Sequence, residues 1–149
     1  MFDPATFLNT AVDGQLSTEY VVIPEGEYIG RIREIQSNNF RLIETKNGPQ
    51  WVLDLTWEFD DPEVAKITHR KVSTARQTIW LELTPEGKLD TSEGTNVQLG
   101  RVREAVGQKE TKDWTISMLS GAMARCQVVH RQSSDGTRTY PDVQAVAAL

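Results

Sequence analysis

The chain has 149 residues, of which 38% are apolar and 25% charged, and its formal net charge is −5 at pH 7. This length fits a single domain with one continuous core, and the composition excludes a disordered chain. No apolar run reaches the roughly 20 residues that cross a bilayer, and the start has no basic region typical of a secretory signal. The single cysteine excludes an internal disulfide and fits a reducing compartment, so we expect an intracellular protein.

Basic and acidic side chains occupy different stretches of the sequence. Residues 64–81 and 114–134 contain no acid, although each stretch carries several basic side chains, whereas acids gather at 54–63 and 82–93. Such segregation permits a positive surface on an acidic protein, and a polyanion responds to that local field. The alternative interpretation is that these stretches are ordinary solvated strand faces and loops.

The first 24 residues show no clear periodicity and are predicted to form an N-terminal arm, followed by one domain over 25–149. The arm is expected to pack on the body or on another subunit, because exposed aromatic residues at this density are unusual. Alternation with period two predicts a first strand over 28–35. The segment 40–45 lies between two clusters of turn residues and is expected to belong to a long connection.

The clearest alternation in the sequence predicts a second strand over 51–59, which the Asp-Asp-Pro at 60–62 ends. A third strand is expected over 72–83. The spacing of apolar residues then changes and predicts a helix over 97–106, with Thr95 or Asn96 as its N-cap and Gly107 as its stop.

A second short helical turn is expected after Asp113, and alternation returns in a strand over 124–130. The Asp-Gly pair at 135–136 predicts a hairpin turn into a last strand over 140–147, in which Pro141 indicates an edge position. The order is three strands, a helix and a two-stranded hairpin. This order predicts an all-β fold with one or two helices, namely the five-stranded OB-fold Greek-key barrel with its helix between strands three and four.

Several segments, in this order, also resemble a known family. They include VIPEGEY at 22–28, RQTIWL at 76–81 and GTNVQLGR at 94–101, together with the strands at 51–57 and 121–131. The set resembles a phage family of single-stranded DNA-binding proteins, related to domains of unknown function found in phage replication and recombination regions. The resemblance implies an OB-fold, a role in DNA replication or recombination, phage or host replication proteins as partners, and the host cytoplasm as location. Binders of this type often end in an acidic tail, whereas this chain ends in apolar residues, so recruitment through such a tail is not expected.

Binding a single strand without sequence preference requires a cationic groove for phosphates and aromatic faces for bases. Trp80 is the best stacking candidate, because Ile79 and Leu81 are predicted to face the core from the same strand. For Trp51 and Trp57, which alternate with leucines, core packing is the better account. Phe40 fits stacking and simple loop anchoring equally well. The predicted nucleic-acid-binding residues are Arg31, Arg33, Phe40, Arg70, Lys71, Arg76, Trp80, Arg125, Arg131 and Tyr140.

An enzymatic function has little support in the sequence. His69 and His130 have no cysteine or carboxylate at metal-ligand spacing, and no glycine-rich phosphate loop is present. Cys126 alternates with core residues, which indicates a buried thiol rather than a nucleophile. We therefore expect no catalytic residue, metal or cofactor.

Two classes of function remain. The first is non-sequence-specific binding of single-stranded DNA. The second is a protein-interaction or assembly module on the same fold, in which Trp80 and the arm bury against a partner, such as a second copy of the chain in a homodimer. Salt distinguishes them, because binding through phosphates weakens steeply as salt rises, whereas an aromatic protein interface barely responds.

Overall fold

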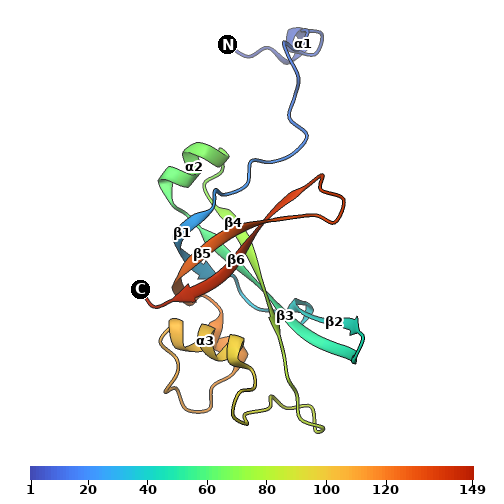
Figure 1. Cartoon of the computed structure of the whole chain (residues 1–149). Coiled ribbons are helices and arrows are strands. Elements are labelled where there is room, and N and C mark those ends of the chain that lie inside the picture. Colours follow the sequence, from blue (N-terminus) through green and yellow to red (C-terminus); the bar gives the residue numbers. More distant parts are fainter.

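The computed structural model describes residues 1–149 and is mostly β, with six strands in one sheet and three α-helices (Figure 1). The strands are β1 (Gly26–Ile32), β2 (Phe40–Thr45), β3 (Gly48–Phe59), β4 (Ser73–Trp80), β5 (Met123–Gln132) and β6 (Thr139–Ala147). The helices are α1 (Pro4–Phe7), α2 (Pro62–Thr68) and α3 (Val97–Ala105), with two 3-10 helices, η1 (Ser37–Asn39) and η2 (Ile116–Leu119).

The strand order in the sheet is β1-β5-β6-β4-β3-β2, and β1 pairs in addition with β3. The strands β1, β4, β5 and β6 therefore each pair with two neighbours, β3 pairs with three, and β2 pairs with β3 alone. All pairings are antiparallel except that of β4 with β6, where Arg76 lies opposite Asp142. The helix α3 contacts β4 and β6 and lies at one end of the sheet, as Figure 1 shows.

The core lies on the inner face of the sheet. The alternation in β3 buries Leu53, Leu55, Trp57 and Phe59 completely, as the sequence predicts. The inward row of β4 includes two polar side chains, Ser73 and Gln77, and Gln77 Oε1 accepts a hydrogen bond from Trp57 Nε1 at 2.9 Å. This bond satisfies the indole N–H, which would otherwise be costly to bury.

The expectation of a long connection over 40–45 is wrong. This segment is β2, which forms a hairpin with β3 through the turn between Thr45 and Gly48. The sheet therefore has six strands instead of the five expected. In β2 only Phe40, Ile43 and Thr45 are half-buried and the remaining residues are exposed, so it presents no regular apolar face.

Two further expectations differ from the structure, and one helix lies where none was predicted. The residues after Asp61 form α2, with the Asp61 side chain accepting a hydrogen bond from the backbone N–H of Glu63 at 2.8 Å. The edge position predicted from Pro141 is wrong, because β6 lies between β5 and β4. The proline is tolerated there because β6 pairs with β4 only at the next residue, Asp142, so no ladder bond to β4 needs the N–H that proline lacks. Trp51, predicted to pack in the core, is 41% exposed near the hairpin end of β3.

The N-terminal arm leads away from the sheet and carries α1 at a distance from it (Figure 1). Residues 1–21 are all exposed, and the apolar side chains of Phe2, Phe7, Leu8 and Leu16 are at least 62% exposed. The arm is anchored where Ile23 enters the core with 1% of its surface exposed. None of the helices is both long enough and apolar enough to span a membrane.

Candidate nucleic-acid interface

The outer face of β4 carries a row of four side chains, Thr74, Arg76, Thr78 and Trp80, which alternate with buried residues. Trp80 is 43% exposed while Ile79 and Leu81 are buried, so the tryptophan faces outward as its spacing predicts. The row therefore places one aromatic ring and one guanidinium four residues apart on the same face of a strand.

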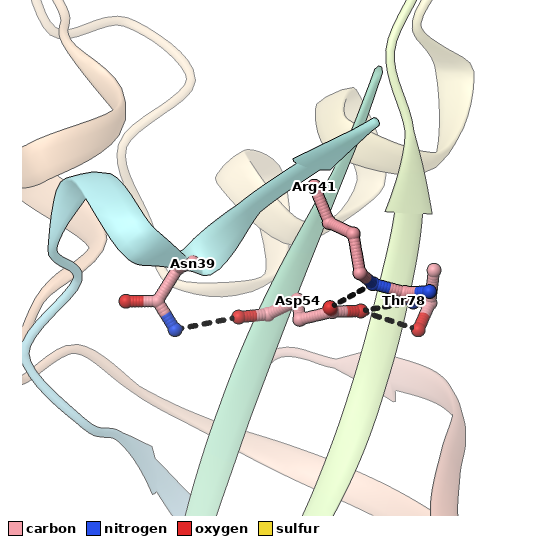
Figure 2. A network of polar contacts seen from close by, with 4 residues as sticks. All are labelled: Asn39, Arg41, Asp54 and Thr78. Carbon is pink, nitrogen blue, oxygen red and sulfur yellow. Dashed lines mark hydrogen bonds and ion pairs between the residues drawn. The ribbon is translucent and has the colours of Figure 1, made fainter. Parts of the chain in front are cut away.

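A polar network joins this row to β2 and β3 (Figure 2). The Asp54 carboxylate accepts hydrogen bonds from Arg41 Nε at 2.9 Å, from Arg41 Nη2 at 3.2 Å and from Thr78 Oγ1 at 2.7 Å. Asn39 Nδ2 donates to the backbone oxygen of Asp54 at 3.0 Å. The strand register places Arg41 opposite Val52, which in turn lies opposite Trp80, and the network orients the Arg41 side chain toward Asp54. A second guanidinium is thus held beside Thr78, which lies between Arg76 and Trp80 in the row.

The network also controls the protonation of Asp54. Burial alone would raise the pKa of this carboxyl from its ordinary value of 3.8. The hydrogen bonds from Arg41 and Thr78, together with the charges of Arg41 and Arg76, outweigh burial and lower the pKa. Asp54 is therefore a stable anion that orients Arg41 at physiological pH.

On its other side, β4 borders a groove shared with β6. Two adjoining depressions of about 520 and 310 Å³ are both lined by Arg76, Arg131 and Asp142, and the larger one is also lined by Tyr140. The Arg131 guanidinium lies 4.8 Å from the centre of the Tyr140 ring, and Arg131 Nε pairs with Asp142 Oδ2 at 2.7 Å. Arg76 belongs to none of the six ion pairs in the structure, so its charge is free to meet a ligand.

The structure brings four of the predicted residues together along β4 and its border with β6: Arg76, Trp80, Arg131 and Tyr140. Arg70 lines a further depression that also includes Tyr140. Lys71 follows Arg70 in the loop before β4 and is exposed.

The other predicted residues lie elsewhere. Arg31 contacts Met123 Sδ at 3.8 Å, Arg33 pairs with Glu58 at 3.2 Å, and Arg125 lies 3.9 Å from Glu27. These three arginines lie along β1 and along the end of β5 that pairs with it. Acidic side chains lie beside them on this part of the sheet.

Phe40 begins β2 and packs half-buried against the core, which is an anchoring position.

Sequence reasoning missed Arg41, Thr78 and Asp142 as parts of this surface. Arg41 required recognition of β2, because only the β2–β3 register places it across from β4. The segregation of acids along the chain also does not persist in space. Asp54 and Asp142 come from other strands and lie beside the basic residues.

Two groups that could suggest catalysis have structural roles. Cys126 is fully buried, and burial raises the pKa of its thiol to about 12, so it is neutral at physiological pH. The His130 ring Nε2 lies 2.8 Å from the backbone oxygen of Ile23 and helps to fix the base of the arm.

No protein-family model matches the chain, and no curated protein matches it. An outward tryptophan, a tyrosine backed by an arginine, and an arginine without an acidic partner lie along one strand and its border. Such an arrangement offers π-faces for flat ligands and cations for anionic groups.

Proposed function

We propose that the protein binds single-stranded DNA without sequence preference, in DNA replication or recombination, on the outer face of β4 and in the groove between β4 and β6. The observation that carries the proposal is the common lining of this groove by Arg76, Arg131 and Tyr140, with Trp80 on the same row. Trp80 and Tyr140 would each stack one base, and the arginines would contact phosphates.

We also propose that the sheet is an OB-fold barrel to which β2 has been added. The pairings of β1, β5, β6, β4 and β3 form a closed circuit, and α3 follows the third strand of that circuit in chain order. The OB-fold binds oligonucleotides on the face of its second and third strands. In this chain those strands are β3 and β4, which carry Asp54, Arg76 and Trp80.

The ion pairs on this surface are compatible with binding. Arg131 and Arg41 are each about half-exposed, with side chains 46% and 47% accessible. Exposed ion pairs contribute about 0–1 kcal/mol, so exchanging Asp142 for a phosphate would cost Arg131 little. Arg41, by contrast, would keep its more buried partner Asp54 and meet a phosphate with its exposed part. Arg76 has no pair to exchange and is expected to make the dominant phosphate contact.

The test is a titration of a fluorescently labelled poly-thymidine of about 30 nucleotides, followed by anisotropy at several salt concentrations. We expect saturable binding that weakens steeply with salt. Arg76→Ala should weaken binding and reduce the slope of log K against log salt by about 0.7, the contribution of one phosphate of a single strand. Trp80→Ala should weaken binding and leave the slope unchanged.

The matched control is Lys112→Ala, which removes the same charge from the loop between α3 and η2, outside the depressions along β4 and β6. It should bind like the unmodified protein. If the protein binds no oligonucleotide even at the lowest salt concentration, the proposal is contradicted. Equal effects of Arg76→Ala and Lys112→Ala would show that the face is wrongly assigned.

One observation favours a second role in assembly. The apolar side chains of the arm, including Phe2, Phe7 and Leu8, contact nothing on the body of their own chain that would bury them. We propose that the arm associates with a second copy of the chain, because such a concentration of exposed apolar groups gains free energy only when a partner removes it from water.

A further inference from the structure

The groove along β4 and β6 continues into a depression at the base of the N-terminal arm. Thr74, Tyr140 and Pro141 line both, so the two are contiguous. The new walls come from arm residues 18–20 and 22–23 and from two basic side chains, Arg70 after α2 and Arg138 in the β5–β6 connection. Neither arginine belongs to an ion pair.

The depression repeats an arrangement already present in the groove. The Arg70 guanidinium lies 4.6 Å from the centre of the Tyr20 ring, as Arg131 lies 4.8 Å from that of Tyr140. Tyr20 is 79% exposed and Tyr140 is 36% exposed, so each ring has an arginine against it and remains accessible to solvent. Two tyrosine platforms of the same construction therefore lie along one continuous surface.

Arg70 is also incompletely satisfied by the protein. Its Nε is buried and has no hydrogen-bond partner, and its Nη2 makes only a long contact of 3.4 Å with the backbone oxygen of Val21. A buried donor without a partner costs free energy that an incoming acceptor can recover after a small rotation of the side chain. A phosphodiester oxygen is such an acceptor, and Arg138, which also lines the depression, supplies a second positive charge.

We propose that this depression is a subsite for one further nucleotide of the bound strand, with its base stacked on Tyr20 and its phosphate between Arg70 and Arg138. The inference rests on the proposed function and deepens it. It assigns the arm a direct part in binding, because the tyrosine belongs to the arm and the two arginines belong to the body.

Glu19 also lines the depression, and its carboxylate opposes a phosphate there. The subsite therefore carries two positive charges and one negative charge. Replacing Glu19 by glutamine keeps the size of the side chain and removes the repulsion, so Glu19→Gln should tighten binding while most substitutions in the subsite weaken it.

The test measures affinity for a series of poly-thymidines of increasing length, up to about 30 nucleotides, with full-length variants. Tyr20→Ala should weaken binding of the long oligonucleotides about fivefold or more, the loss of one stacked base, and should shorten by one nucleotide the length at which affinity stops rising. Tyr20→Phe, which keeps the ring, should behave like the unmodified protein. Arg70→Ala and Arg138→Ala should each reduce the salt slope.

The outcomes separate the subsite from the proposed function. If the unmodified protein binds no oligonucleotide, both fail. If it binds, and Arg76→Ala weakens binding, but Tyr20→Ala leaves affinity and length dependence unchanged, only the subsite is overturned. Unchanged affinity of Glu19→Gln would overturn the placement of the phosphate. Because Tyr20 is largely exposed, its variants should unfold at the same temperature as the unmodified protein, which excludes a folding defect.

Discussion

Asp54 is the single side chain that connects three strands on the candidate surface, since it binds Arg41 of β2 and Thr78 of β4 from its own position on β3. Its side chain is only 16% accessible, so these bonds are poorly screened by water. The residue thus contributes to stability and to the orientation of Arg41 through the same contacts.

Asp54→Asn should lower the free energy of unfolding at neutral pH by about 1–3 kcal/mol, because it removes hydrogen bonds to a charged group. The pKa of Asp54 is lowered in the folded protein from 3.8, so its contribution is complete above that value and is lost as the pH falls through the lowered pKa. The difference between the variant and the unmodified protein should therefore shrink in acid. Urea unfolding at neutral pH and at a pH below the ordinary carboxyl pKa measures this difference in unfolding free energy.

The control for this substitution is Glu86→Gln, a change of the same kind at an exposed loop position. It should leave the free energy of unfolding within about 0.5 kcal/mol at either pH. A constant difference between Asp54→Asn and the unmodified protein across the pH range would contradict the assigned role of the carboxylate.

At the scale of elements, Gly30 in β1 lies against core side chains that leave no room for a Cβ atom. A Cβ atom added there would lie 2.7 Å from Phe59 Cε1 and 3.1 Å from Cys126 Sγ, and both side chains are fully buried. Gly100 in α3 is different, because nothing lies within 4 Å of a Cβ added at that position. The same substitution should therefore have opposite effects in the two elements.

Gly30→Ala should destabilise the protein by about 1–3 kcal/mol through overpacking. Gly100→Ala should stabilise it by up to about 1 kcal/mol, since alanine favours a helix interior over glycine. The midpoints of urea unfolding measure both effects if the slope of the unfolding free energy against urea concentration is unchanged. A loss of stability in both variants would mean that α3 is more crowded than its surroundings indicate.

How far the sequence predicts an element depends on whether one face of it is buried. β3, β4 and β5 alternate because their inner faces form the core, and all three were predicted. β2 has no regular buried face, so only its pairing with β3 defines it as a strand. The seven residues of α2 are too few to establish a helical period, although Asp61 and Pro62 give the capping signal with which a helix begins.

The candidate surface was predictable to the same extent. The outward position of Trp80 follows from local alternation, and so does that of Arg76. The positions of Arg31, Arg33 and Arg125 could not be inferred, because they depend on β1 pairing with both β3 and β5, which brings these arginines to the acids of that side. Charge partners are set by pairing across the sheet, and sequence order does not reveal them.

At the scale of the whole molecule, association through the arm makes a specific prediction. Light scattering should give a mass of about twice the 16.8 kDa of one chain, with little dependence on salt, because apolar contacts are not screened. Replacing Phe7 and Leu8 by serine should give the mass of a single chain. The control is Leu42→Ser, an exposed apolar residue on β2 outside the arm. A single-chain mass for the unmodified protein over a wide concentration range would contradict association.

The closed circuit of strand pairings also has a consequence for how the chain folds. The ladder between β1 and β5 pairs Gly26 with Val128, which are far apart in the sequence. In addition, β5 and β4 each keep one unpaired edge until β6 inserts between them. The mean sequence separation of contacts is therefore large, and chains of high contact order fold slowly because loop-closure entropy is lost before the contacts form. Until β6 inserts, two apolar strands remain open to pairing with other chains, so substitutions that weaken β6 should reduce the yield of folded protein before they affect any binding surface.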